Sequence, residues 1–102
     1  MYRYSTPTLP LKMKDIDFAE VDFFRVAVSD GDTTHIFVVR PTDENADAEK
    51  HIINVALTQQ QTAKLAEGEG KVQVRIKFLS GSVLPTEIKG VTIKDVLDEV
   101  II

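Results

Sequence analysis

The side chains of this sequence best suited to bind a metal ion or to carry a proton are its two histidines, His35 and His51. A metal site in a protein needs several converging ligands. The chain has no cysteine, so carboxylates would have to complete the set. Both histidines fall in stretches patterned like β-strands, and nothing in the sequence shows that these strands pair. We therefore predict two partly exposed sheet histidines, and neither a metal site nor a cofactor.

One acidic segment resembles the start of a calcium-binding loop. It reads Asp43-Glu44-Asn45-Ala46-Asp47, which fits the spacing D-x-N-x-D. The match ends there, because Ala48 stands where such loops need glycine and Asn54 where they need a bidentate glutamate. We expect a solvated loop over residues 41–50 that holds no calcium.

The residue patterns typical of enzymes are missing from the sequence. Ser29, Ser80 and Ser82 lie near turns, but no G-x-S-x-G elbow surrounds any of them. The glycines form neither a phosphate-binding loop nor a dinucleotide fingerprint. The acidic pair Asp15 and Asp17 could serve a glycosidase only inside a cleft, which a chain of this length can barely build. We expect no catalytic residues and no enzymatic activity.

The balance of charge disfavours two classes of partner. The 102 residues include 12 basic and 16 acidic side chains, a formal charge of −4. Nucleic acids and anionic membranes both select basic surfaces, and no apolar run approaches the roughly 20 residues of a membrane span. We expect neither partner. The cations that could gather on a sheet face are better explained as solubilising residues: Lys12, Lys14, Arg25, Arg40, Lys71, Arg75, Lys77 and Lys89.

The stretch Lys71–Phe78 indicates the architecture that must position any functional residue. Apolar and polar residues alternate throughout it, and successive side chains of a strand point to opposite faces. Val72, Val74, Ile76 and Phe78 therefore share a buried face, while the polar residues between them face water. A sheet with one buried and one water-facing side is usually antiparallel.

Three further strands are predicted in the first half of the chain. Thr8–Met13 alternates as well, and Pro10, which has no N–H, places this strand at the edge of a sheet. The dipeptide Asp30-Gly31 is a hairpin signal, and it lies between strands expected over Val21–Val28 and Thr33–Arg40.

The stretch His51–Leu57 predicts another strand, and the sequence that follows it indicates a short helix. Thr58 and Gln61 have the spacing of a capping box, in which each satisfies a backbone N–H of the other. We expect a helix from Gln59 to about Ala66.

The last part of the chain leaves two readings open. Residues 82–93 form one long strand or a bent pair, because Pro85 and Gly90 interrupt the pattern. Residues 94–102 fit a helical turn or a docked tail, which we prefer, and the alternative is a last strand over Asp98–Ile102.

These elements predict an all-β protein, an immunoglobulin-like antiparallel β-sandwich of about seven strands with one short helical connection. A small barrel is the alternative, because the number of strands alone does not separate the two. We expect one sandwich domain over residues 8–102. Residues 1–7 are expected to form an N-terminal arm that is either frayed or ordered by a partner.

We expect the surface of this domain to act through contacts with other proteins. The run Ile36–Val39 is apolar on both faces of its strand, which indicates either burial on both sides or an exposed stripe that a second chain covers. Aromatic residues and arginine are enriched in protein interfaces. The interface candidates are Tyr2, Tyr4, Leu9, Phe23 and Phe37, with Phe23 expected opposite Phe24, on the face away from the core.

Several segments together resemble a known group of proteins. In order along the chain they are Arg3–Leu9, Leu57–Thr62, Val72–Ile76, Glu87–Val91 and Val96–Ile101. The series looks like short proteins of phages and prophages of Gram-positive bacteria, and the layout resembles the immunoglobulin-like N-terminal domain of phage baseplate upper proteins. This chain ends where baseplate proteins continue into stalk segments.

The resemblance implies a non-enzymatic structural or adaptor module of a virion, associated with a tail or baseplate. Its partner would be another protein or a second copy of itself, and it would be found in the cytoplasm of the bacterial host or in the assembled virion. The alternative is a carbohydrate- or small-ligand-binding sandwich, with the ligand at loop 41–50.

Overall fold

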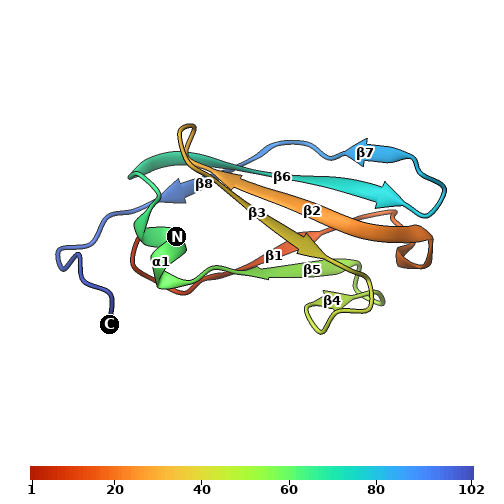
Figure 1. Cartoon of the computed structure of the whole chain (residues 1–102), viewed down its shortest axis with the longest axis horizontal. Helices are drawn as coiled ribbons and strands as arrows, with labels where there is room; N and C mark the ends of the chain where they lie inside the picture. Colours follow the sequence, from red (N-terminus) through yellow and green to blue (C-terminus); the bar gives the residue numbers. More distant parts are fainter.

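The computed structural model describes every residue from Met1 to Ile102, and it consists of two antiparallel β-sheets (Figure 1). One sheet has three strands in the order β1-β5-β4. The other has five, in the order β3-β2-β6-β7, with β8 also paired to β6. The strands are β1 (Thr8–Lys12), β2 (Val21–Ser29), β3 (Thr34–Val39), β4 (Ala46–Asp47), β5 (Ile52–Ala56), β6 (Gly68–Phe78), β7 (Val83–Pro85) and β8 (Lys89–Ile93). The predicted all-β class is confirmed.

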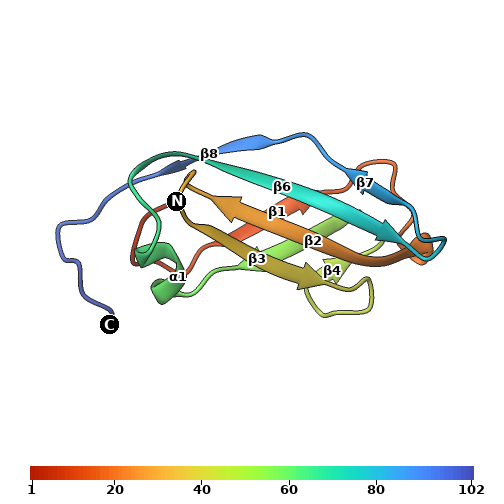
Figure 2. The same ribbon diagram turned by 45° about the horizontal axis from the view of Figure 1, so that its top comes forward.

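The two sheets lie face to face as the layers of a sandwich (Figure 2). Because the sheets remain separate, the alternative of a closed barrel is wrong. The three-stranded sheet has the order of the B, E and D strands of an immunoglobulin-like sandwich, and the larger sheet that of C′, C, F and G. A short helix, α1 (Gln59–Ala63), connects β5 to β6, as expected.

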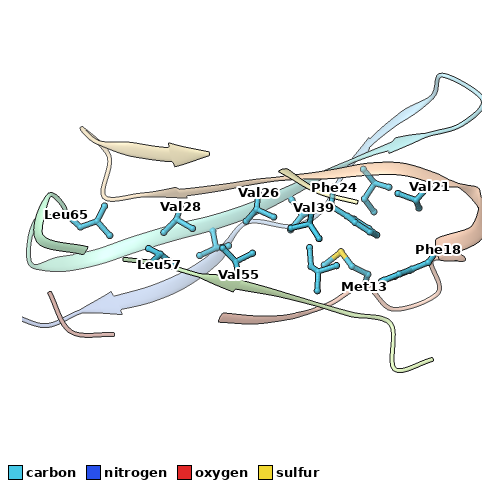
Figure 3. Packing of buried hydrophobic residues seen from close by; sticks show 14 of the residues in the cluster. Met13, Phe18, Val21, Phe24, Val26, Val28, Val39, Val55, Leu57 and Leu65 are labelled. Atoms are coloured by element: carbon cyan, nitrogen blue, oxygen red, sulfur yellow. The ribbon is translucent and has the colours of Figure 1, made fainter. Parts of the chain in front are cut away.

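The core forms where the alternating faces of the two sheets meet (Figure 3). Phe24, Val26 and Val28 of β2 are fully buried, which confirms the face predicted from their spacing. Phe18 closes one end of the core, with its ring centroid 4.9 Å from that of Phe24. The buried apolar residues are Met13, Phe18, Val21, Phe24, Val26, Val28, Val39, Ile53, Val55, Leu57, Leu65, Val72, Val74, Ile76 and Ile93.

The β2–β3 hairpin is fixed by the side chain of Asp30. Its carboxylate accepts hydrogen bonds from the backbone N–H groups of Thr33 at 2.6 Å, Ala66 at 2.7 Å and Asp32 at 2.8 Å. These donors stabilise the charged form, so they hold the pKa of Asp30 below its ordinary value. Gly31 has φ +104°, a conformation that glycine adopts without strain. The expected hairpin is therefore confirmed.

The capping box of α1 is present in full. Gln61 N donates to Thr58 Oγ1 at 3.2 Å, and Thr58 N donates to Gln61 Oε1 at 2.8 Å. The helix ends earlier than the expected Ala66, since Lys64 is its C-cap. β6 then begins at Gly68, three residues before the alternating stretch that predicted it.

Two open questions about the C-terminal half are answered by the pairing of β6. Residues 82–93 form a bent pair, because β7 and β8 both pair with β6 and are separated by a break. Residues beyond Lys94 contain no helix or strand, so a docked tail describes them better than a last strand. In Figure 1 this tail leaves the end of the sandwich.

The first seven residues differ from expectation, because they lie against their own chain. Arg3 N donates to Lys94 O and Lys94 N to Met1 O, both at 2.8 Å. Tyr2 forms a parallel bridge with Lys94, which extends the edge of the larger sheet at β8. This segment is therefore part of the folded unit, although no local pattern in the sequence indicated it.

Candidate protein-contact surface

Several exposed apolar and cationic residues share the side of the five-stranded sheet that faces away from the core. Residues directly opposite on antiparallel strands lie on the same face, so the register defines this side. We call it the outer face. It comprises Phe23, Arg25, Ala27, Ser29, Thr34, Ile36, Val38, Glu69, Lys71, Gln73, Arg75, Lys77, Val83, Pro85, Gly90 and Thr92.

The apolar part of the outer face begins on β3. Ile36 and Val38 are 43% and 51% exposed, while Phe37 and Val39 between and beside them turn toward the core. Burial on both sides of the run Ile36–Val39 is therefore wrong, and an exposed stripe is the correct interpretation. Single exposed apolar residues are ordinary, but neighbouring ones on a sheet edge form a candidate contact surface.

The cationic part of the outer face lies on β2 and β6. Arg25 is directly opposite Arg75, an arrangement in which two like charges cost stability. Lys77 Nζ donates to Gly81 O at 3.1 Å. None of these three side chains forms an ion pair, since the three ion pairs of the structure involve only Arg3 and Arg40. The outer face thus carries free positive charge in a protein of formal charge −4.

A small hollow of about 100 Å³ lies among these cations, lined by Phe23, Arg25, Arg75, Lys77 and Val83. A bulge between Val21 and Phe23 shifts the register of β2 against β6, and Phe23 follows it onto the outer face, where it was expected. The guanidinium of Arg40 lies 5.9 Å from the centre of the Phe23 ring. Arginines beside an aromatic ring suit a carboxylate group of a partner.

The two tyrosines among the interface candidates lie elsewhere, at the end of the sandwich near α1. Tyr2 is 52% exposed, and Lys94 Nζ lies 5.5 Å from its ring centre. Tyr4 is half-buried with φ +56°, which is strained for a bulky residue. Its neighbour Ser5 donates its N–H to Thr62 Oγ1 at 3.1 Å and accepts from that hydroxyl at 2.9 Å.

Arg3 holds this end of the molecule together. Its Nε and Nη2 donate to the carbonyls of Leu65 and Ala63 at 2.6 and 2.9 Å. Its Nη1 lies 2.8 Å from Asp95 and 3.3 Å from Glu99. Its hydrogen bond to Asp95 raises the pKa of Arg3, while the N–H of Val96 and then Arg3 lower the pKa of Asp95. The role of Arg3 is structural: it joins the N-terminus, α1 and the tail.

The remaining candidates, Leu9 and Phe37, point inward. Both are half-buried and pack against the core, from opposite sheets. The structure therefore does not gather the five candidates into one site. Only Phe23 lies on the outer face. The cations around Phe23 were among those that the sequence could gather on a sheet face, but only the register shows that Arg25 lies directly opposite Arg75.

The two histidines and the acidic loop 41–50 form hydrogen bonds with other groups of the same chain. His35 Nε2 donates to Gln61 O at 2.8 Å, and His51 Nδ1 donates to Ile16 O at 2.7 Å. In the loop, Asp43 accepts from the N–H of Arg40, and Asn45 donates to Asn54 O. The loop also contains β4, which no pattern predicted. No group of three or more potential metal ligands occurs in the structure.

The sole α-helix of the structure has five residues, so no helix is long enough to cross a bilayer. The outer face remains the strongest candidate for a functional surface. Comparison of the chain with protein-family models, curated proteins and solved structures gives no match.

Proposed function

We propose that this protein is a non-enzymatic structural or adaptor module that acts through protein–protein contacts. The observation that carries this proposal is the outer face, where exposed apolar residues surround cations that have no acidic partner in the chain. Paired arginines are costly within the protein alone, and they gain most when a partner supplies the opposite charge. The partner surface would be acidic, with carboxylates that meet Arg25 and Arg75.

The setting that we propose is a phage or prophage virion, at the tail or baseplate. Support comes from the resemblance of the sequence segments to short phage proteins. An immunoglobulin-like sandwich suits such a role because its surfaces can carry many different contacts on one scaffold.

Cross-linking mass spectrometry of purified particles tests this proposal directly. Particles of the phage or prophage that encodes the chain should contain it, with cross-links to another virion protein from Lys71 and Lys77 of the outer face. Lysines elsewhere, such as Lys14 and Lys64, are exposed and serve as the internal comparison. Absence of the chain from purified particles would overturn the virion role.

A pair of charge-reversal variants distinguishes a specific role of the outer-face arginines from an effect of the protein's net charge. The variant Arg25→Glu/Arg75→Glu should lose incorporation into particles, while Lys14→Glu/Lys64→Glu, with the same change in net charge, should retain it. Equal incorporation of both variants would remove the outer face from the contact.

The alternative of a carbohydrate or small-ligand site at loop 41–50 gains no support from the geometry. Three polar side chains of the loop, those of Asp43, Asn45 and Asp47, are used by the chain itself. Asp47, for example, accepts from the N–H of Lys50 at 3.1 Å. The alternative stays a prediction that calorimetry against a glycan panel would test.

A further inference from the structure

The free edge of β3 has the properties of a strand that pairs with another strand. β3 is the terminal strand of the larger sheet, visible along one side of it in Figure 2. Asp30 N donates to Thr33 O at 3.1 Å, and hydrogen-bonded pairs recur at every second residue of an antiparallel ladder. The backbone N–H and C=O groups of Thr34, Ile36 and Val38 therefore point away from β2.

Nothing in the chain covers these outward groups or discourages pairing there. No hydrogen bond of the structure uses the backbone of Thr34, Ile36 or Val38 outside the β2–β3 ladder. The strand, Thr-His-Ile-Phe-Val-Val, has no proline, glycine, lysine or acidic residue. Sheet edges that natural proteins protect usually carry one of these or a bulge.

We propose that two copies of this chain pair through their β3 edges, antiparallel and with Ile36 opposite Ile36, to form one continuous sheet. This register uses all the outward groups, because Thr34 of each copy then meets Val38 of the other. A contact of this kind is symmetric about a twofold axis, so it closes at two copies.

Charge complementarity supports a second copy as the partner. In this register Arg40, which follows β3 in one copy, lies next to the β2–β3 turn of the other copy, which contains Asp32, at both ends of the paired strands. Both side chains are exposed. Asp32 has no ion pair in the single chain, and Arg40 has one, with Asp22 at 3.1 Å. The five donors of a guanidinium can serve two carboxylates.

The same register also covers half-buried side chains on the inner side of β3. Phe37 of each copy would meet His35 of the other, and both residues are half-buried in the single chain. On the outer side, the exposed Ile36 side chains would pack together. The paired strands are short, so we expect a weak dimer that forms at about 0.1–1 mM protein.

This inference goes beyond the proposed role of the outer face, since it concerns the edge of the sheet and names a different partner. A chain that stays monomeric would overturn the dimer and leave the outer-face proposal standing. Loss of particle incorporation in the Arg25→Glu/Arg75→Glu variant would bear only on the outer face.

Engineered disulfides test both the dimer and its register, because the chain has no native cysteine. The variant Ile36→Cys should form a disulfide-linked dimer under mild oxidation, since facing Cα atoms in a hydrogen-bonded pair are about 5.5 Å apart. The matched control Val38→Cys should not, because its two cysteines would lie about 13 Å apart along the strands. Disulfides need Cα atoms within roughly 7 Å. A mixture of Thr34→Cys and Val38→Cys chains should again cross-link.

Sedimentation equilibrium of the unmodified chain, with charge variants, completes the test. Asp32→Arg and Arg40→Asp should each raise the dimer dissociation constant by about tenfold, and the double variant Asp32→Arg/Arg40→Asp should restore it. A monomer at about 1 mM, or equal cross-linking of Ile36→Cys and Val38→Cys, would overturn the proposal.

Discussion

The strand β1 of the smaller sheet and the strand β3 of the larger one each have an open edge, and the residues along these two edges differ. On β1, Pro7 O accepts from Leu57 N and Met13 N donates to His51 O, so Thr8, Pro10 and Lys12 present their backbones outward. Pro10 has no N–H to offer an incoming strand, and Lys12 is a charged neighbour. On β3, the outward residues are Thr34 and two exposed aliphatic residues.

This difference indicates which strand edge is open to pairing with another strand. An open strand edge is a template for association, and proteins usually block it. β1 carries such a block and β3 does not, although both edges belong to the same small domain. The C-terminal end of the β8 edge is covered by the N-terminal segment, through the Tyr2–Lys94 bridge and the bond from Met1 N to Thr92 O. The edge of β3 therefore carries neither the block seen on β1 nor a covering segment.

The largest loss of stability should come from Arg3→Ala, because Arg3 holds the N-terminal segment against the edge of β8. It loses contacts with two carbonyls and two carboxylates, and we expect a loss of about 3 kcal/mol in unfolding free energy. Urea denaturation measures it. Hydrogen exchange of Val91 and Ile93 should speed up as a third edge opens.

The control for this variant is Lys64→Ala, which removes an exposed cation close to the same end of α1 and should change stability by less than about 0.5 kcal/mol. Equal stability of Arg3→Ala and the unmodified chain would show that the N-terminal segment is not needed to close the β8 edge.

A somewhat smaller loss is expected from Gly70→Ala, where β6 passes close to its neighbours. A Cβ atom there would lie 2.9 Å from both Ser29 O and Ile93 Cδ1, and the backbone oxygen cannot move aside easily. We expect a loss of about 2 kcal/mol, measured by thermal or urea unfolding. Gly90→Ala is the control, since a Cβ atom there would come no closer than 3.8 Å to the side chain of Glu69.

Acidification should loosen the hairpin that presents the β3 edge. The folded-state pKa of Asp30 is lowered by its backbone hydrogen bonds, so its contribution to stability is present above its unfolded pKa of 3.8. That contribution is lost as the pH falls from there through the folded pKa. Stability measured between pH 6 and 2 should fall less steeply in Asp30→Asn, which already lacks the titrating group. Parallel curves for the two chains would contradict this role.

The smallest change in stability is expected for Pro10→Thr, which tests directly whether Pro10 protects the edge of β1. It restores an outward N–H on β1 and should cost no more than about 1 kcal/mol, mainly by freeing the unfolded chain. We expect stronger self-association than in the unmodified chain, measured by light scattering. Pro7→Thr is the control, because the carbonyl of Pro7 already faces β5. No gain in association would show that Pro10 does not protect the edge.

Much of the fold could be read from local patterns. The alternation of Val72, Val74 and Ile76, the Asp30-Gly31 turn and the Thr58–Gln61 capping box each depend on residues near one another in the chain. Such patterns are set by side-chain direction, backbone torsion and nearby hydrogen bonds. They predicted most strands, the helix and the buried face. They missed β4, which has two residues and is too short for any period.

The candidate contact surfaces depended instead on contacts between distant parts of the chain. The sequence by itself determined that alternating residues would form two layers and that Pro10 would mark an edge. Only the tertiary structure decided that Arg25 would face Arg75, that Arg3 would dock against α1, and that β3 would end its sheet uncovered. The physical reason is that register and strand order come from burial shared by the whole domain, which no short segment contains.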